Sequence, residues 1–414
     1  MMNIEMLSTL VEEKLKDTDK SLNDFTTTHL TEFKEKGFKE VTLDSYKFTS
    51  LESFFEKLNN GEKFTGKIPN ESFNFPTITF IDGEWVNSDP LPQGVTVRKI
   101  KDHFDVVKND LLENNALSHI HHALFEEGIF IEVAKNEEIK TPLRLVHYQT
   151  KSGISALTHL VVAHPHSKIT LIEETRALGN ASQGVISETY IKALPNSKVE
   201  HISLELQNEK GLIHSSLFSE VEQNAEVRSV VFHAKGLMNR KNLTLNLNAP
   251  GSHGESYSLY LTKEGEHSDI FTEINHKSPD TTSRQISKGI LDGDSKGIFT
   301  GKIHIYPKSQ RVNSSQLNKN LLLSKKAQVH SQPQLEIFAD DVKCSHGSTT
   351  GQLSPDEVFY LEARGIPKER ARNLLAMGHG MEIVQNIQNE KGRIYISGII
   401  RDLLSEKFSL KGSP

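Results

Sequence analysis

A cysteine and a histidine two residues apart are the side chains of this sequence best suited to metal or sulfur chemistry. Cys344 is the single cysteine of the chain, and His346 follows it within the run ADDVKCSHG. Because alternate residues of an extended strand point to the same face, the two side chains are expected side by side. A thiolate beside an imidazole can ligate iron or activate sulfur chemistry. The alternative is a small buried cysteine beside a hydrogen-bonded histidine.

A second group of metal-capable side chains lies at residues 118–122, which read Ser-His-Ile-His-His. Imidazole nitrogens are suitable ligands for iron or zinc. If this segment is a helix, neighbouring side chains point about 100° apart, so His119 and His122 share a face and His121 does not. The spacing therefore favours packed or solvated histidines over a metal site.

The motifs of nucleotide hydrolysis and calcium binding are incomplete in this chain. Residues 297–302 read GIFTGK, which has one residue too few between its glycines for a phosphate loop, and Ile303 stands where Ser or Thr is needed. Residues 292–294, Asp-Gly-Asp, begin like a calcium loop, but Lys296 and Ile303 occupy ligand positions, so a turn is expected. Neither an H-E-x-x-H nor a C-x-x-C motif occurs. We therefore expect no nucleotide hydrolysis by this chain.

The elements that must position these residues change character along the chain. From about residue 128, β-branched and apolar residues alternate with polar ones for about 200 residues, with little helical periodicity. Similar segments recur after small or polar turns, and His-Pro-His at residues 164–166 is interpreted as one of these turns. Spacings of 30, 28 and 28 residues separate Ile169, Val199, Val227 and Glu255. A period in this range favours the stacked coils of a parallel β-helix, with an antiparallel sandwich as the alternative.

Segments of different texture flank the repeats. We predict three parts: an N-terminal helical and irregular region at residues 1–125, a parallel β-helix core at residues 126–350, and a C-terminal helical module at residues 351–414. In the first part, apolar residues at helical spacing predict helices over residues 7–15, 51–58 and 105–124. A short strand-like run covers residues 77–81. The expected fold class is therefore mainly β with helical flanks.

The last part of the chain carries clear helix signals. Ser354 begins a Ser-Pro-Asp-Glu run that is typical of a helix start, and Gly365 marks the end of this helix. A second helix is expected from Pro367 to just before Gly378, and a final amphipathic helix over residues 394–404. These signals predict a helical module after the β-helix.

Composition excludes several classes of protein. The 414 residues include 48 basic and 54 acidic side chains, and the net charge of −6 gives no general attraction to nucleic acid or anionic membranes. No apolar run approaches the roughly 20 residues that a bilayer span needs. One cysteine rules out an intrachain disulfide framework and a four-cysteine metal site. We therefore expect a cytoplasmic protein that binds neither nucleic acid nor membrane.

Three sequence runs are distinctive: QLNKNLLL at residues 316–323, PQLEIFADDVKCSHG at residues 333–347 and FYLEARG at residues 359–365. Together with weaker similarity at residues 128–133, they resemble the SufB/SufD family of the SUF iron–sulfur cluster assembly machine. The likeness covers roughly residues 125–385, and the ADDVKCSHG run is highly specific, whereas the N-terminal part is not diagnostic. One departure is Gly-His-Gly at residues 378–380, where the family usually carries an aromatic residue after the glycine.

The resemblance implies a right-handed parallel β-helix between helical N- and C-terminal regions. It implies pairing with a SufB-like subunit through the β-helix, and binding of a SufC-like ABC-type ATPase through the C-terminal helices. The apolar anchors of the ATPase site would be Phe359, Leu361, Leu374 and Leu375. The resemblance also places His346, with Cys344 beside it, at the SufB-like interface where the family forms a nascent cluster.

The expected chemistry is transient binding rather than catalysis. No cofactor is expected to be stably bound, and a transient iron–sulfur cluster, or newly acquired iron, would be held at the interface by thiolates of the SufB-like subunit and by His346. Histidine is a weaker donor than thiolate and titrates at about pH 6.5, which suits release of the cluster. A purely structural homodimer without cluster contact is the alternative.

A carbohydrate-active β-helix enzyme is a further class to consider. Such an enzyme would need paired carboxylates on the inward face of its coils. The adjacent residues Glu173 and Glu174 face opposite sides of a strand, so they do not form such a pair. This class is therefore disfavoured.

Overall fold

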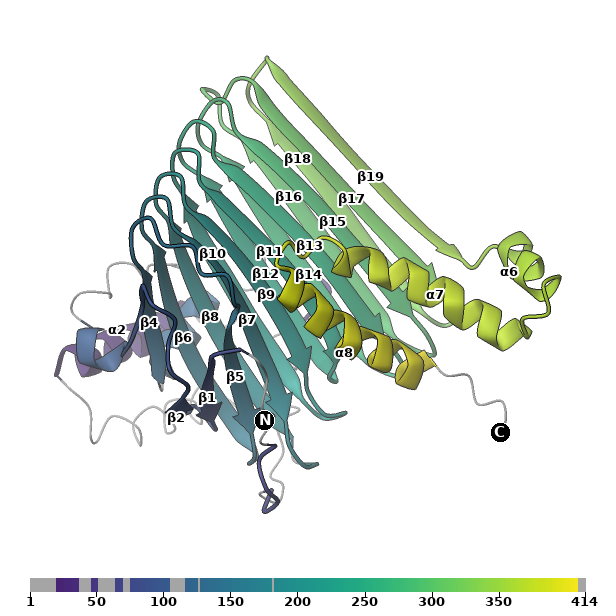
Figure 1. Cartoon of the computed structure of the whole chain (residues 1–414), viewed down its shortest axis with the longest axis horizontal. Helices are drawn as coiled ribbons and strands as arrows, with labels where there is room; N and C mark the ends of the chain where they lie inside the picture. Colours follow the sequence, from purple (N-terminus) through teal and green to yellow (C-terminus); the bar gives the residue numbers. More distant parts are fainter. Residues whose placement is uncertain are drawn as a thin grey trace.

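The computed structural model describes residues 20–36, 46–50, 64–69, 75–104, 116–125, 127–180 and 182–408. Within these residues the fold is mainly β, because parallel strands stack in two long sheets and the chain passes from one sheet to the other at each turn (Figure 1). This arrangement is a parallel β-solenoid. The predicted β-helix with helical flanks is confirmed.

From β4 onward, odd-numbered strands lie in one sheet, called sheet A, and even-numbered strands in the other, called sheet B. In the part of the chain that the structure describes, sheet A has ten strands, in the order β2 (Glu84–Ser88), β1 (Thr77–Ile81), β5 (Leu143–Gln149), β7 (Lys168–Ala177), β9 (Lys198–Leu206), β11 (Glu226–Lys235), β13 (His253–Thr262), β15 (Thr282–Leu291), β17 (Val312–Leu322) and β19 (Val342–Gln352). Sheet B has nine strands there, in the order β3 (Val95–Lys99), β4 (Glu127–Val133), β6 (Gly153–Ala163), β8 (Gln183–Ala193), β10 (Leu212–Val221), β12 (Met238–Leu247), β14 (His267–His276), β16 (Lys296–Ile305) and β18 (Gln328–Ile337).

Parallel pairing keeps equivalent residues of successive coils in register. Ile169 pairs with Val199, and Val199 pairs with Val227, as the repeat spacing predicted. Val227, however, pairs with Gly254 rather than with the predicted Glu255. The shift by one residue has a physical reason. Val227 and Gly254 face the interior, whereas Glu255 faces outward and is ion-paired on the outer face of sheet A.

The interior of the solenoid, called the lumen below, is filled by side chains, because alternation along each strand places every second residue inside. The coils nearest the N-terminus bury a continuous set of aliphatic residues that includes Leu145, Leu157, Val161, Leu171 and Ile191. Toward the C-terminal coils, hydroxyl and amide side chains replace many of the aliphatic ones. They bond from coil to coil, as Gln316 does when its Nε2 donates to Oε1 of Gln285 at 2.7 Å.

Residues with positive φ mark one corner of the coils. Asn136, His166, Asn196 and Asn224 have φ values of 64°, 63°, 63° and 53°. Asparagine and histidine enter this left-handed region more readily than most residues. The backbone N–H of Asn136 donates to the carbonyl of Pro165 in the turn of the next coil at 3.1 Å. The His-Pro-His segment is therefore a turn between strands, as predicted.

The segment before the first full coil contributes strands to both sheets. β1 pairs with β5 in sheet A, and β3 pairs with β4 in sheet B. Sequence analysis expected one short strand here, at residues 77–81, and the structure has β1 at these residues with β2 and β3 after it. The sheets therefore begin before the repeats that were visible in the sequence.

Two described helices cover the outer face of sheet B. They are α2 (Lys20–Lys36) and α5 (Ala116–Ala123), and the apolar residues buried there are Leu22, Ile100, Phe104, Phe125, Phe130, Leu160, Tyr190 and Phe218. The helices predicted over residues 7–15 and 51–58, and residues 105–115 of the third, lie outside the described residues. No described helix is both long enough and apolar enough for a membrane crossing.

Three helices follow the last strand: α6 (Pro355–Glu362), α7 (Lys368–Val384) and α8 (Glu390–Phe408). Ser354 caps α6 by accepting the backbone N–H of Glu357, as its sequence predicted. α7 and α8 share a buried apolar cluster with the outer face of sheet A. α6 lies apart from the sheets at the far end of α7 (Figure 1).

The prediction that the second C-terminal helix ends before Gly378 is wrong, since α7 continues through Gly378 and Gly380 to Val384. Packing explains the continuation. A Cβ at Gly380 would lie 3.3 Å from Cδ1 of Ile290 and from Cδ1 of Leu404. Glycine therefore allows α7 to approach the sheet closely, and the burial this permits outweighs the low helix propensity of glycine.

Candidate functional site

Among the described residues, the last coil forms the open end of both sheets; it is made of β18 and β19 and is called the terminal coil below. Phe48 from the N-terminal region stacks on the ring of His330 of β18, with centroids 4.3 Å apart. The strands β18 and β19 are the outermost ones of sheet B and sheet A, so among the described strands each has a neighbour on one side only (Figure 1). All of their residues are exposed or half-buried, whereas β15 is almost entirely buried. Such an edge presents unpaired backbone N–H and C=O groups, which makes it a surface for pairing with another chain.

Cys344 and His346, the predicted cluster ligands, both lie on β19. They are in register with Ser314 and Gln316 of β17, so both side chains lie on the lumen side of the sheet. His346 is exposed, and Cys344 is half-buried against apolar residues such as Val312. The structure therefore brings the two residues together on one face, at the open end of the solenoid.

The surroundings of Cys344 do not activate its thiol. Burial raises the pKa of the Cys344 thiol, and a backbone hydrogen bond at Ser314 lowers it by less. Because its pKa is raised, Cys344 remains a protonated thiol near neutral pH in the isolated chain. The thiolate, not the thiol, is the form that ligates metals. Among the described residues, no group of three metal-ligating side chains includes Cys344 or His346. A cluster on this face therefore needs ligands from another molecule.

Apolar and aromatic side chains that sequence analysis missed are exposed at the end of β18. Ile337 and Phe338 have exposed fractions of 39% and 58%. The rings of His304 and Phe338 have centroids 5.3 Å apart, and Nδ1 of His304 lies 2.8 Å from the Glu336 carboxylate. This hydrogen bond holds the pKa of Glu336 below its usual value. Exposed aromatic residues of this kind are enriched at protein interfaces.

The four predicted ATPase anchors differ in exposure. Phe359 on α6 and Leu374 on α7 have exposed fractions of 70% and 43%. Leu361 and Leu375 are half-buried. Tyr360, which sequence analysis did not select although it adjoins Phe359, is also exposed, at 55%. Large apolar residues left exposed on a projecting helix form a candidate docking surface.

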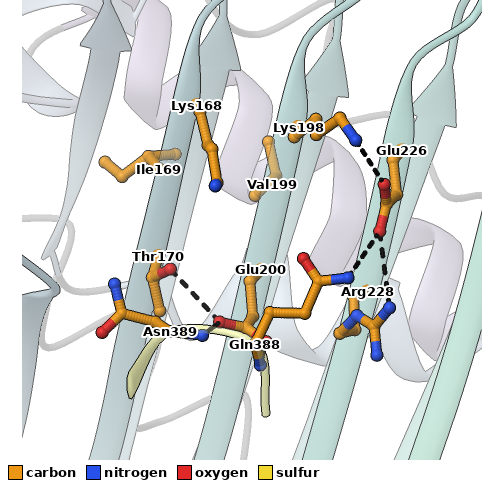
Figure 2. Close-up of a pocket in the computed structure, with 10 residues that line it drawn as sticks. All are labelled: Lys168, Ile169, Thr170, Lys198, Val199, Glu200, Glu226, Arg228, Gln388 and Asn389. Carbon is orange, nitrogen blue, oxygen red and sulfur yellow. Dashed lines mark hydrogen bonds and ion pairs between the residues drawn. The ribbon is translucent and has the colours of Figure 1, made fainter. Parts of the chain in front are cut away.

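A small pocket of about 50 Å³ lies where the connection between α7 and α8 crosses β7, β9 and β11 (Figure 2). The Glu200 carboxylate accepts the backbone N–H groups of Gln388 and Asn389 at 2.6 and 3.0 Å. Arg228 donates to the backbone carbonyl of Asn386 at 2.9 Å. These polar groups fasten the connection to the sheet, so we assign the pocket a structural role.

The adjacent residues Glu173 and Glu174 face opposite sides of β7, as predicted. Glu174 lies on the outer face, where its carboxylate accepts from Nε of Arg144 at 2.8 Å and from the hydroxyl of Tyr395 on α8 at 2.6 Å. Glu173 lies in the lumen, where His201 donates to it at 2.9 Å. The two carboxylates do not form the inward pair that a glycosidase needs.

The histidines of residues 118–122 are packed beneath α2 rather than solvated. Nε2 of His122 lies 3.1 Å from the Glu188 carboxylate on β8, and Nε2 of His121 lies 3.9 Å from it. The Tyr190 hydroxyl donates to the same carboxylate at 2.6 Å. Burial favours a raised pKa for Glu188, but the adjacent histidines hold its pKa well below the usual range. These contacts tie α5 to sheet B, in agreement with the packing interpretation.

One hydrolase-like pattern is excluded by its place in the fold. Residues 293–297 read Gly-Asp-Ser-Lys-Gly, a match to G-x-S-x-G that sequence analysis overlooked. A nucleophile elbow lies between a strand and a helix, whereas this segment joins β15 to β16 and Gly293 has a φ of 60°. Ser295 is buried and accepts a hydrogen bond from Thr262 at 3.0 Å. The segment is a turn, as predicted for residues 292–294.

The fold and these surfaces define a class of protein. It is a parallel β-solenoid with an uncapped terminal coil, two potential ligands on that coil, and a projecting helix with exposed apolar residues. A comparison with known proteins agrees with this class and identifies the family within it. The family model for "SUF system FeS cluster assembly, SufBD core domain" matches residues 146–379, which is more than half of the chain. The chain belongs to this SufBD core family, as the resemblance to SufB/SufD sequences predicted.

Curated relatives support the same family over most of the chain. The iron-sulfur cluster assembly protein SufD of Escherichia coli is 27% identical over 379 residues, which cover 87% of this chain and 88% of the relative. SufD of Bacillus subtilis is 26% identical over 74% of this chain and 70% of the relative. An iron-sulfur cluster assembly SufBD family protein of Synechocystis is 26% identical over 75% of this chain and 74% of the relative.

Proposed function

We propose that this chain is a non-catalytic subunit of a SUF-type iron–sulfur cluster assembly scaffold. The observation that carries the proposal is the position of Cys344 and His346, side by side on the uncapped terminal coil of a SufBD-family solenoid. A strand edge without a neighbour is completed by pairing with another chain. A SufB-like subunit of the same fold would present matching edge strands. The cluster is the cargo of this assembly and not a resident cofactor of the chain.

One thiol and one imidazole do not suffice for a cluster, because iron–sulfur clusters are generally held by four protein ligands. In the proposal, thiolates of the SufB-like subunit complete the set, and His346 contributes a nitrogen ligand. Iron binding displaces the proton of Cys344, which the raised pKa of this thiol otherwise retains. Histidine holds iron less firmly than thiolate does, which suits iron acquisition and transient holding of a nascent cluster.

We place the SufC-like ATPase on the exposed surface of α6 and α7. Phe359, Tyr360 and Leu374 are large side chains exposed there, and such residues serve as anchors in the groove of a partner. α7 is one continuous helix that packs on β13 and β15. A movement of the bound ATPase would therefore act on coils that lie close to the terminal coil.

The proposal includes a resting state and a location. Without its partner, the chain can pair with a second copy through the same terminal coil, since identical edges are self-complementary about a two-fold axis. This homodimer is an outcome that the experiment below distinguishes from the heteromeric complex. We propose that the assembly works in the cytoplasm and takes neither nucleic acid nor membrane as a partner.

The proposal is tested by anaerobic co-purification of the tagged chain with its cognate SufB-like and SufC-like proteins, followed by iron and acid-labile sulfide analysis. His346→Ala should leave the complex assembled but lower iron and sulfide on the order of tenfold, since even indirect support of a metal ligand has effects of that size. Phe359→Ser with Tyr360→Ser should release only the ATPase. Lys343→Ala, on the opposite face of β19, is the matched control.

Two outcomes would count against the proposal. Unchanged iron and sulfide in His346→Ala would exclude the ligand role of this residue. A chain that elutes as a metal-free homodimer in the presence of both partners would exclude the scaffold role.

A further inference from the structure

Three buried side chains far from the terminal coil converge inside the lumen. His147 on β5, His159 on β6 and Glu173 on β7 each offer one ligand atom, and these atoms lie within 4.8 Å of one another. The Nε2 atoms of the two histidines are 3.4 Å apart, and Nε2 of His147 is 3.9 Å from Oε1 of Glu173. The exposed fractions of the three residues are 2%, 0% and 5%. Stacking of successive coils therefore assembles a closed group of potential metal ligands.

The distances suit a divalent metal ion. Nitrogen and oxygen ligands bind zinc at about 2.0–2.1 Å, so a tetrahedral site places its ligand atoms roughly 3.3 Å apart. The two imidazole nitrogens are already at this separation. The carboxylate oxygen lies 3.9 Å from Nε2 of His147 and within 4.8 Å of the His159 nitrogen, so it needs to approach by about 0.5 to 1.5 Å. Two imidazoles with one carboxylate are a donor set that zinc and ferrous iron both accept.

In the described part of the chain, the carboxylate of Glu173 has no direct bond to a lysine or an arginine. Among the residues that the structure describes, its ion-pair partners are His147 and His201. The adjacent Glu174, by contrast, is held by two arginines on the outer face. The buried Lys241 attracts the Glu173 carboxylate electrostatically, but it makes no ion pair with Glu173 and is shared with Glu205. A neutral imidazole does not balance the charge of a buried carboxylate. A divalent ion between Glu173 and the two histidines would add to the balance that Lys241 provides.

Hydrogen bonds and packing already orient these ligands. Oε2 of Glu173 accepts from Nε2 of His201 and from the hydroxyl of Thr189, both at 2.9 Å, which leaves Oε1 toward His147. The ring of Phe80 stacks on the ring of His147 with centroids 4.9 Å apart. Metal ligands in proteins are typically fixed by outer contacts of this kind.

The hydrogen bonds of His159 identify the rearrangement that metal binding requires. The backbone N–H of Ile129 donates to Nδ1 of His159 across 3.4 Å, so the neutral ring carries its proton on Nε2, between the two histidines. A metal ion would take the place of this bridging proton. The proton would move to Nδ1 of His159, at the expense of the long contact to Ile129, and both histidines would stay neutral.

We propose that His147, His159 and Glu173 bind one divalent transition-metal ion, zinc or ferrous iron, in the lumen of the solenoid. The site is separate from the terminal coil, since β5 and β19 lie near opposite ends of sheet A. It does not depend on the proposed function. Because its ligands are buried and meet only in the folded chain, the ion is taken up as the coils assemble and acts as a structural centre.

The test is the metal content of the full chain, expressed with zinc or cobalt in the medium and purified without chelator. A Cys344→Ser/His346→Ala background excludes metal on the terminal coil. We expect about one ion per chain that resists chelator in the native protein and is released by denaturant. His159→Gln and Glu173→Gln should each remove most of it. His276→Gln, which changes another buried histidine, should retain it.

A native protein without bound metal under these conditions would overturn the proposal, and so would an unchanged metal content in His159→Gln. If the variants do not fold, X-ray absorption at the zinc edge, measured on the folded Cys344→Ser/His346→Ala protein, identifies the ligands of the bound ion. Two imidazole ligands with oxygen support the site, whereas one imidazole or none contradicts it.

Discussion

At Cys344 the surrounding protein opposes reactivity in the isolated chain. Burial raises the pKa of its thiol, while the neighbouring His346 is exposed at the same open edge. A protonated thiol and a single imidazole do not hold a cluster by themselves. In the proposed scaffold, this pair therefore functions only together with ligands of a second chain.

Buried histidines make the stability of the chain depend on pH. His276 bonds to the hydroxyls of Thr281 and Ser283 at 2.7 and 2.9 Å, and burial lowers its pKa to about 3. In the unfolded chain the same ring titrates at about pH 6.5. The unfolded state therefore binds more protons between these values. The contribution of His276 to the free energy of unfolding is complete above the pKa that this histidine has in the unfolded chain. It is lost as the pH falls toward the pKa of His276 in the folded chain, at about 1.4 kcal/mol per pH unit.

This dependence is measurable with one substitution. His276→Gln removes the titrating group. When the pH is lowered from about 7 to about 5, the free energy of unfolding should therefore fall by about 2 kcal/mol less in the variant than in the wild type. Denaturant unfolding at the two pH values measures the difference. Equal losses in the two proteins would show that His276 is not held neutral by burial.

The two kinds of candidate ligand differed in how far they could be predicted. Cys344 and His346 are two residues apart on one strand, so alternation alone placed them on the same face. His147, His159 and Glu173 are separated by 12 and 14 residues, and they lie on three different strands. They become neighbours only when the coils stack in a known register, which local periodicity does not determine.

At the scale of elements, the repeat predicted the strands better than their register. Ile169, Val199 and Val227 are inward aliphatic residues, and their spacing revealed the stacked coils. The next inward residue is Gly254, which gives no hydrophobic signal, so the alignment moved to the outward Glu255. The helix end expected near Gly378 failed for a related reason, because close packing on the sheet overrides local propensity.

The fit of α7 on sheet A gives a second stability prediction. Gly380→Leu would force a side chain into Ile290 and Leu404, and should destabilise the chain by roughly 1–3 kcal/mol, as overpacked cores do. Nothing lies within 4 Å of a Cβ built at Gly378, so Gly378→Leu should be neutral or stabilising. Thermal or denaturant unfolding measures both variants. Equal effects at the two positions would contradict the close approach of α7 to the sheet.

At the scale of the whole molecule, the two proposed partner surfaces belong to one connected body. α7 and α8 pack on sheet A, and the same sheet ends in β19, which carries Cys344 and His346. α6 projects from this body (Figure 1). Phe359 and Tyr360 on this helix are exposed. A force applied at α6 would therefore reach the terminal coil through packed elements rather than through a flexible linker.

The central claim is that the terminal coil is the partner surface, and the single cysteine of the chain provides its probe. The rate of Cys344 alkylation is measured at a concentration where the isolated chain is monomeric, alone and with the SufB-like or the SufC-like protein. The SufB-like protein should slow alkylation at least about tenfold, because a covered residue reacts only when the interface opens. The SufC-like protein alone should leave the rate unchanged. An unchanged rate in a complex shown to contain the SufB-like protein would show that the terminal coil is not the partner surface.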